Sequence, residues 1–298
     1  MAFSNIFISH CKAFIKRFFP DSVKRRMILN YMRKQAVGRR KVKTALGFEV
    51  SVCDHCNLNC VSCEHFSPIA DETFLDIEQY EKDCKRLSEL FGGEIAWLHL
   101  MGGEPLLHPR LIEILEISRR YFKSGSIELV SNGILLLKQS DLFWETCRKN
   151  DITVAVTQYP IKLDHKLIER KAVETGIRFR YYFIGHKTMH KKPLDINGRQ
   201  NIAENLSLCH KFNTCVQLVS GKLYTCIEMA YIKYFNKYYN QNLVVDENDS
   251  IDIYKAKTKH EILEKLAKPV SFCKYCDIKN TDFGIEWRVS KKEISEWT

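Results

Sequence analysis

The sequence lacks the segments with which proteins enter or cross a membrane. No stretch reaches about 18 uncharged apolar residues, so no transmembrane helix is expected. The N-terminus has neither the uninterrupted apolar core nor the small-residue cleavage site of a secretory signal. Internal repeats and low-complexity tracts are also missing. The protein is therefore expected in the cytoplasm, where thiols stay reduced.

Acidic residues are almost missing from one end of the chain. Residues 1–48 hold twelve Lys or Arg and a single acid, Asp21, whereas the rest is nearly neutral. Two segments there interleave apolar residues at helical spacing with basic ones: Phe3, Ile6, Phe7, Phe14 and Phe18, then Val23, Met27, Ile28 and Tyr31. This composition is typical of helices lying on an anionic membrane surface, which predicts peripheral attachment at the inner face of the membrane through residues 1–40.

A helical arm packed on the protein's own body explains the same pattern equally well, with its basic residues in solvent. Nucleic acid is not an expected partner, because no recognisable binding module accompanies the arm.

From residue 47 the chain alternates short apolar runs with segments of helix length. The expected strands are 48–53, 95–101, 126–131, 152–157 and 178–184. The expected helices are 74–91, 108–123, 139–149 and 163–175. Regular alternation predicts parallel strands with crossover helices, hence an α/β sheet or barrel whose ligands sit at the carboxyl ends of the strands.

The regular alternation of strand and helix segments ends after about residue 185. A polar linker is expected at 186–200, then a hairpin from 214–220 and 222–226 around Gly221, a polar stretch, and an amphipathic helix at 258–268. These features predict three parts: a basic arm at 1–46, an α/β barrel part at 47–190, and a smaller domain at 191–298.

Cysteine is the unusual component, with twelve residues in a chain of 298. Cys56, Cys60 and Cys63 follow the first strand with the spacing Cys-x3-Cys-x2-Cys. Such a loop can fold three thiolates around one iron–sulfur cubane and leave its fourth iron without a protein ligand. The alternative is a zinc site that also uses Cys53, although three residues between the two pairs make a closed tetrahedral site cramped. Otherwise Cys53 is expected to be a core thiol or to lie just outside the ligand set.

The next motif ends the second strand. Met101-Gly102-Gly103-Glu104-Pro105 places two glycines, which let a backbone approach a ligand closely, before a carboxylate that can accept from an ammonium group. Alone, it fits a glycine-rich turn followed by a helix-capping acid.

A second cysteine set lies in the last third of the chain. Cys209, Cys226, Cys273 and Cys276 come from a segment before the hairpin, from its end and from a late Cys-x2-Cys pair. Four thiolates so arranged suit one iron–sulfur cluster or one zinc ion. Cys215 is left over in this region.

CNLNCVSC after the first strand and MGGEP after the second together resemble the radical SAM superfamily. The resemblance implies a partial (β/α) barrel of five to six parallel strands, and a [4Fe–4S] cluster on Cys56, Cys60 and Cys63 to which S-adenosylmethionine binds. It assigns Gly102, Gly103 and Glu104 to the cofactor's methionine part, and more loosely Ser131 and Asn132 at the end of the third strand. One departure is Ser62, where the family often has an aromatic residue.

The second cysteine set resembles the twitch domain, a shortened SPASM domain, of carbohydrate-acting radical SAM dehydrogenases. That likeness implies an auxiliary [4Fe–4S] cluster on Cys209, Cys226, Cys273 and Cys276 within a β-hairpin and helix domain. Cys215 is then either an inert thiol or a hydrogen-atom donor to a substrate radical, as in some epimerases of the family.

The resemblance therefore predicts an enzyme that cleaves S-adenosylmethionine to a 5′-deoxyadenosyl radical and takes hydrogen from a sugar, polyol or glycan precursor. Oxidation by a dehydrogenase and epimerisation are both open outcomes, and a flavodoxin- or ferredoxin-type protein is the expected electron donor. Two alternatives stand beside it: a maturase of ribosomal peptides, and a non-catalytic zinc-binding interaction protein.

Overall fold

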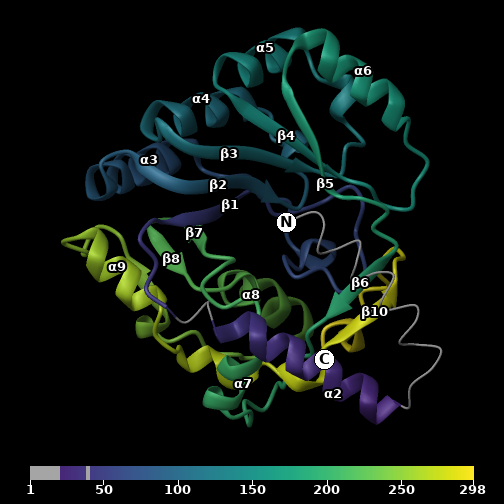
Figure 1. Ribbon diagram of the computed structural model, residues 1–298, viewed down its shortest axis with the longest axis vertical. Coiled ribbons are helices and arrows are strands. Elements are labelled where there is room, and N and C mark those ends of the chain that lie inside the picture. The colour runs from purple at the N-terminus through teal and green to yellow at the C-terminus, as the bar shows by residue number, and fades with distance from the viewer. Residues whose placement is uncertain (1–20, 38–40) are drawn as a thin grey trace.

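A computed structural model describes residues 21–37 and 41–298 of the chain. Figure 1 shows one curved sheet with helices α3 to α6 along its outer side, while α2, α7 and α8 lie on the opposite side. Within the described ranges, no helix combines the length and hydrophobicity needed to cross a bilayer. The first of the two basic segments, with Phe3 to Phe18, falls outside the described residues.

Five consecutive strands are parallel and build most of the sheet, as the sequence predicted. They are β1 (Gly47–Cys53), β2 (Glu94–Gly102), β3 (Ser124–Ser131), β4 (Ile152–Thr157) and β5 (Arg178–Phe183). The crossover helices are α3 (Ile77–Phe91), α4 (Leu111–Tyr121), α5 (Asp141–Lys149) and α6 (His165–Thr175). The α/β fold class with a largely parallel sheet is thereby confirmed.

The two faces of this sheet differ in chemistry. Along β1, Phe48, Val50 and Val52 belong to the main hydrophobic core with α3 to α6. Side chains alternate along a strand, so Glu49 and Ser51 point to the opposite, inner face. Both polar residues are nonetheless buried. The outer face therefore carries the core, and the inner face carries polar groups.

The predicted hairpin is present and extends the same sheet. β7 (Gln217–Val219) pairs parallel with β1, and β8 (Lys222–Tyr224) and β9 (Ser250–Asp252) follow in antiparallel pairing. Its turn needs Gly221, because φ is +78° and a Cβ there would lie 2.7 Å from the Tyr254 ring. The described sheet thus has the order β5-β4-β3-β2-β1-β7-β8-β9. The division of 47–298 into two domains stays a prediction.

Several elements were not foreseen. The stretch after the hairpin, expected to be polar, begins with α8 (Ile227–Tyr239), whose apolar residues build a second core with Phe66, Phe272 and Trp297. The expected polar linker contains β6 (Thr188–Lys191), which pairs with β10 (Asp282–Glu286). α7 (Ile202–Leu208) precedes Cys209. The helix predicted at 258–268 is α9 (Lys259–Leu266).

Short 3-10 helices connect these elements: η2 (Ser67–Ile69), η3 (Pro105–Leu107), η4 (Leu136–Lys138), η5 (Glu247–Asp249), η6 (Ser271–Tyr275), η7 (Ile278–Asn280) and η8 (Ile294–Glu296).

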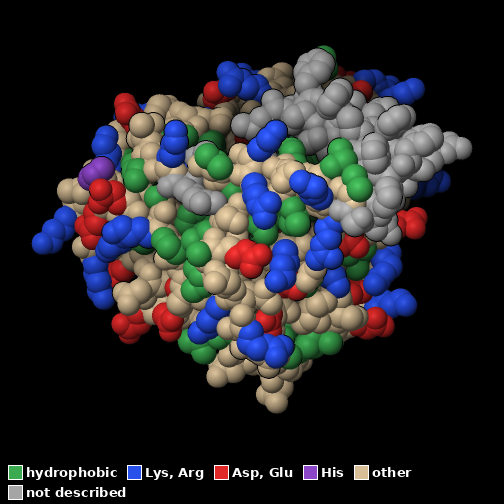
Figure 2. Space-filling view, turned by 60° about the horizontal axis from the view of Figure 1, so that its bottom comes forward, with side chains coloured by type: hydrophobic (Ala, Val, Ile, Leu, Met, Phe, Trp, Pro, Cys, Tyr) green, Lys and Arg blue, Asp and Glu red, His purple; other side chains and the backbone are tan. Residues whose placement is uncertain are grey.

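The second basic segment forms α2 (Asp21–Val37), longer than the predicted 22–32. Its residues Met32 and Ala36 are buried, and Met32 packs against Leu208 of α7 and Cys276. Apolar side chains of α2 also remain exposed: Val23, Met27, Ile28, Tyr31 and Val37. Figure 2 shows Lys and Arg side chains interspersed with hydrophobic ones on this side of the molecule. The described part of the arm is therefore a helix docked on the body that still presents an apolar and basic surface.

Asp83 of α3 ties the hairpin to the crossover helices. It is 2% exposed and accepts hydrogen bonds from the Gly221 amide (2.8 Å), the Gln79 side chain (2.8 Å) and the Tyr254 hydroxyl (2.6 Å).

Asp83→Ala leaves these donors without their acceptor, so we expect the free energy of unfolding to fall by about 3 kcal/mol. Urea unfolding measures this. Glu89→Ala, which removes an exposed carboxylate on the same helix, is the control. An equal loss of unfolding free energy in both variants would contradict the role of Asp83 in holding the hairpin.

Candidate functional site

The first cysteine loop leaves the carboxyl end of β1 and folds back on itself. Asn59 and Ser62 adopt positive φ angles of 52° and 53°, and these two left-handed turns bring the chain round. As a result Cys56, Cys60 and Cys63 lie near enough for the charge of one thiolate to act on the others. The structure therefore brings together the three residues that the spacing predicted.

Burial disfavours the ionised form of these thiols. Burial, with neighbouring acidic groups, raises the pKa of Cys56 and of Cys60 to about 12, and it also raises the pKa of Cys63. Thiolates here therefore need a positive partner such as a metal centre. Cys53 is buried beside them, but its sulfur faces the His55 ring at 3.1 Å.

Several N–H groups point at two of the sulfurs. The Leu58 amide lies 3.4 Å from Cys56 Sγ, and the Asn132 side-chain amide lies 3.7 Å from it. The Trp287 indole N–H donates to Cys60 Sγ at 3.1 Å. Hydrogen bonds to cluster sulfurs are one of the means by which proteins stabilise and tune iron–sulfur centres. The donor set fits such a centre.

The two glycines of the second motif serve the contact with this loop. A Cβ on Gly102 would lie 2.5 Å from the Cys53 carbonyl oxygen, and one on Gly103 would lie 2.0 Å from the His55 carbonyl oxygen. With no side chains in the way, the Gly103 amide donates to the Cys53 carbonyl (2.6 Å) and the Glu104 amide donates to the His55 carbonyl (3.1 Å). The close approach predicted for these glycines is an approach to the cysteine loop itself.

Glu104 is fully buried beneath the loop. Its carboxylate accepts from the Ser131 hydroxyl at 2.8 Å and from the amides of Asn132 (2.9 Å) and Leu106 (3.0 Å). Burial outweighs these donors and raises its pKa to about 7. The predicted residues Ser131 and Asn132 therefore join the site through Glu104, and an ammonium group next to this carboxylate would favour its ionised form.

The second cysteine set also converges. Cys209, Cys226, Cys273 and Cys276 line one small, mostly apolar cavity. Its walls also include Lys192, whose buried ammonium lies 2.5 Å from the Glu228 carboxylate.

The Cys-x2-Cys loop of this set is held by a buried side chain. Asn205 of α7 donates to the carbonyls of Cys273 (2.8 Å) and Cys276 (2.5 Å). Across the described residues, no group of three or more His, Cys, Asp or Glu side chains is positioned to hold a single metal ion.

Cys215 does not line the cavity of the second cysteine set. It precedes β7, and burial with the charges of Glu49 and Glu64 raises its pKa to about 12, against the opposing charge of Lys211. Its surface is only partly covered. Cys215 therefore belongs to the inner face of the sheet and keeps its S–H bond at neutral pH.

The C-terminal segment completes the first site, which the sequence did not reveal. The Val61 amide donates to the Arg288 carbonyl at 3.0 Å, and the Ser62 hydroxyl donates to the Glu296 carbonyl at 2.8 Å. The Trp297 indole donates to the Cys63 carbonyl at 2.9 Å. We call residues 287–297 the C-terminal strap. Trp287 and Trp297, two tryptophans near the end of the chain, are the sequence feature that could have indicated this contact, but the spacing of the cysteines does not point to them.

Aromatic rings reach the first site from outside the cysteine loop. Tyr159, after β4, lies close enough to the three thiols for their charges to act on its hydroxyl, and its ring centre lies 6.2 Å from that of Trp287 in the strap. The loop itself has Ser62 before the third cysteine. Distant segments thus supply the aromatic surface that the loop lacks.

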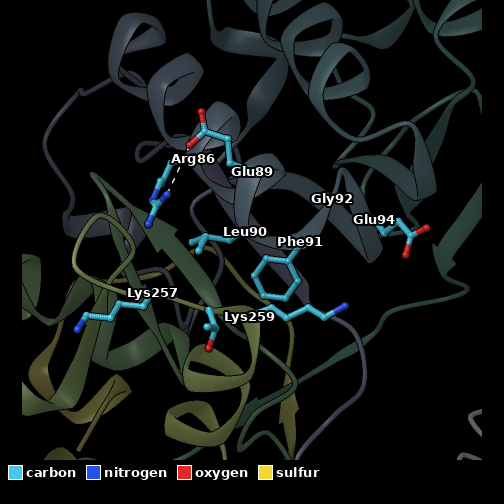
Figure 3. A pocket seen from close by; sticks show the side chains of 9 residues that line it. Arg86, Glu89, Leu90, Phe91, Gly92, Glu94, Lys257 and Lys259 are labelled. Carbon is cyan, nitrogen blue, oxygen red and sulfur yellow. Dashed lines mark hydrogen bonds and ion pairs between the residues drawn. The ribbon is translucent and has the colours of Figure 1, made fainter.

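An open groove elsewhere on the molecule is remote from this chemistry. Figure 3 shows it between the end of α3 and the start of α9, with Arg86, Phe91, Glu94 and Lys259 around it. Glu94 begins β2, so the groove lies at the amino edge of the parallel strands. The cysteine loop and Glu104 lie at the carboxyl edge, where ligands of such sheets bind.

Similarity to curated proteins is partial. The chain matches no protein-family model. It is 32% identical over 98 residues to the probable GTP 3′,8-cyclase of Methanothermobacter thermautotrophicus, covering 33% of this chain and 30% of that protein. It is 29% identical over 96 residues to the GTP 3′,8-cyclase of Chlorobaculum tepidum, covering 32% and 28%. The chain thus spans about 30% of the length of the curated relatives that it matches.

Solved structures resemble the chain weakly. BtrN in complex with AdoMet and 2-DOIA gives a TM-score of 0.47 at 14% identity, over 80% of this chain and 94% of that one. Native anSMEcpe with bound AdoMet and Cp18Cys peptide gives 0.36 at 20% identity, over 46% and 42%. At these values the likeness carries no argument about activity or substrate.

The raised pKa of Glu104 predicts how stability depends on pH in the metal-free, ligand-free protein. The folded state holds this proton up to about pH 7, and the unfolded state releases it near the usual pKa of about 4.3. Between these values the folded state binds more protons, so the free energy of unfolding falls as pH rises, by about 2–3 kcal/mol from this group. Urea unfolding at pH 5 and pH 8 should show this loss in the natural protein and not in Glu104→Gln. If the free energy of unfolding changed equally with pH in both proteins, Glu104 would not be the buried group that binds this proton.

Proposed function

We propose that this chain, which resembles the radical SAM superfamily, binds a [4Fe–4S] cluster and S-adenosylmethionine and uses them to abstract hydrogen from a substrate. One observation carries the proposal: Cys56, Cys60 and Cys63 converge from a single loop that lies directly on the Gly103–Glu104 backbone. When bound, the cluster and S-adenosylmethionine supply a 5′-deoxyadenosyl radical that removes hydrogen from an unactivated C–H bond.

The residues of the chain prepare this site. Cys56, Cys60 and Cys63 are proposed as the three ligands, so one iron stays free of protein ligands. Glu104 accepts from the ammonium group of the methionine part, a charge-assisted bond that restores its ionised form. Ser131 and Asn132 hold the carboxylate in position through the hydrogen bonds described above.

Cys209, Cys226, Cys273 and Cys276 are proposed to hold an auxiliary [4Fe–4S] cluster, as in twitch domains. Their common cavity supports a shared ligand, and the thiolate set matches that of a [4Fe–4S] centre. If metal analysis finds a zinc ion at these four cysteines, the site is a structural zinc site and not an auxiliary cluster.

The proposed substrate is a sugar, polyol or glycan precursor, and oxidation to a carbonyl is favoured over epimerisation. The similarity to GTP 3′,8-cyclases covers about 30% of those enzymes and does not extend a GTP substrate to this chain. A partly covered Cys215 on the inner face supports the epimerase alternative, since a thiol with an intact S–H bond can return a hydrogen atom to a substrate radical.

A flavodoxin- or ferredoxin-type protein is proposed as the electron donor, and an anionic membrane surface as the partner of residues 1–40. The exposed apolar side chains of α2 beside Arg25, Arg26 and Arg33 support the second proposal. Such attachment would bring the enzyme to a lipid-linked glycan precursor.

The decisive experiment is anaerobic purification followed by iron analysis and an assay for 5′-deoxyadenosine. We expect about eight irons per chain, from two [4Fe–4S] centres, and reductive cleavage of S-adenosylmethionine. Cys60→Ala should lower iron to about four and abolish cleavage, because three ligands leave no redundancy. Cys53→Ala, whose sulfur faces His55, is the matched control and should keep both. A colourless chain with bound zinc, or full cleavage by Cys60→Ala, would overturn the proposal.

Cys215 and the auxiliary set distinguish the two net reactions. For oxidation, Cys226→Ala should stop product formation, whereas Cys215→Ala should be nearly silent because no hydrogen returns to the substrate. For epimerisation, Cys215→Ala should leave cofactor cleavage running while solvent deuterium no longer enters the substrate. Mass spectrometry of the product in D₂O separates these results, with Cys147→Ala, a buried thiol behind the sheet, as the control.

A further inference from the structure

Lys192 and Glu228 form a buried ion pair beside the second cysteine set. The Lys192 ammonium lies 2.5 Å from the Glu228 carboxylate, and the two side chains are only 6% and 4% exposed. Glu228 lies in the first turn of α8, two residues after Cys226. Lys192 lines the cavity that the four cysteines share. One member of the pair therefore follows a cysteine of the set along the chain, and the other reaches the same cavity from a different segment.

The backbone that follows Lys192 is fixed to the Cys-x2-Cys loop of this set. Leu194 pairs with Cys276 in an antiparallel β-bridge. One residue further along the loop, the Asp277 amide donates to the Pro193 carbonyl at 2.8 Å. Lys192 directly precedes this pairing, so the fold itself sets the distance between its side chain and the cysteine loop.

The Lys192 ammonium lies within electrostatic reach of all four thiols. Burial lowers the pKa of Lys192, but negative charges outweigh this effect and hold that pKa well above its usual value. These charges are those of the Glu228 carboxylate and of three ionised cysteines: Cys276, Cys226 and Cys209. Burial also raises the pKa of Cys273, and the ammonium opposes that rise. One cation therefore serves the whole cysteine set.

Stability alone does not account for this ion pair. Taking two charges out of water can cost more free energy than their attraction returns, and apolar side chains often replace such pairs without loss. An ammonium has three N–H donors, and among the described residues Glu228 is the one ion-pair partner of Lys192. Thr225, which also lines the cavity, is 3% exposed, and its hydroxyl has no hydrogen-bond partner within the described chain. Spare donors in a cavity of four thiols fit the sulfur atoms of a cluster, which accept hydrogen bonds.

The two charges of the pair act on such a cluster in opposite directions. Four thiolates make the centre negative, and reduction by one electron adds a further negative charge. A nearby cation therefore favours the reduced form, and a nearby carboxylate opposes it. Burial raises the pKa of both Cys276 and Cys226; next in size, Lys192 opposes this rise at Cys276 and Glu228 adds to it at Cys226. The ammonium thus dominates at the Cys-x2-Cys loop and the carboxylate at the start of α8.

We propose that the Lys192 ammonium donates to a sulfur of the auxiliary [4Fe–4S] cluster and raises its reduction potential, while Glu228 holds the ammonium in place and limits its effect. The Thr225 hydroxyl supplies a second, neutral donor to the same centre. The potential of the cluster is then set by a charge pair in its wall as well as by its four cysteines. This inference rests on the auxiliary cluster of the proposed function and assigns the side chains that tune it.

The test is a redox titration followed by EPR, carried out in the Cys60→Ala background, where the auxiliary cluster is the centre that remains. Glu228→Gln should raise the midpoint potential, because it removes the opposing carboxylate and keeps the ammonium. Lys192→Met added to Glu228→Gln should then lower the reduction equilibrium constant at least about tenfold, which is about 59 mV for one electron. The comparison of these two variants removes the ammonium without leaving a buried carboxylate unpaired.

Glu128→Gln in the same background is the control and should leave the potential unchanged, because it removes a mostly buried carboxylate that pairs with Arg180 outside this cavity. Equal potentials in the two Glu228 variants, or loss of iron from the one that also carries Lys192→Met, would overturn the proposal. Iron analysis of Cys60→Ala itself tests the proposed function separately. Zinc or no metal there excludes the auxiliary cluster and the role of Lys192 with it, whereas about four irons with equal potentials refute the role of Lys192 alone.

Discussion

Two backbone hydrogen bonds, from Gly103 to Cys53 and from Glu104 to His55, hold the rest of the site in place. They join the carboxyl ends of two neighbouring strands at a distance that no side chain larger than hydrogen permits. The three thiols on one side of this contact and the buried carboxylate on the other are thereby fixed relative to each other. The sheet supplies the strand ends, and the two glycines allow them to meet.

Much of this arrangement can be predicted from the sequence because it is local. Strands β1 to β5 and their helices follow from apolar runs and spacing, and Cys56, Cys60 and Cys63 lie within eight positions of one another. Contacts between distant segments leave no such pattern. α8 was missed because its apolar residues lie on several sides, as befits a helix buried between the sheet and the second core. Trp287 and Trp297 reach the cysteine loop from more than 220 positions away.

The same sheet serves two purposes through the alternation of its side chains. Its outer face is apolar and supplies most of the hydrophobic burial, so its residues are set by packing against α3 to α6. Its inner face carries Glu49, His99, Glu128 and Arg180, and its groups are only partly satisfied within the chain. The apolar packing that stabilises the fold and this row of charged side chains therefore lie on opposite sides of one element.

The contacts of the C-terminal strap affect the order in which parts of the protein fold. Residues 287–297 bond to the cysteine loop across most of the length of the chain, and contacts of such long sequence separation form late in folding. The sheet and the cysteine loop, which depend on nearer partners, can form before the strap docks. Until then the loop is uncovered on that side, so iron and sulfide for the proposed cluster would have access to Cys60 and Cys63 only before the strap docks. Docking of the strap then covers the loop on that side and adds the Trp287 hydrogen bond to Cys60 Sγ.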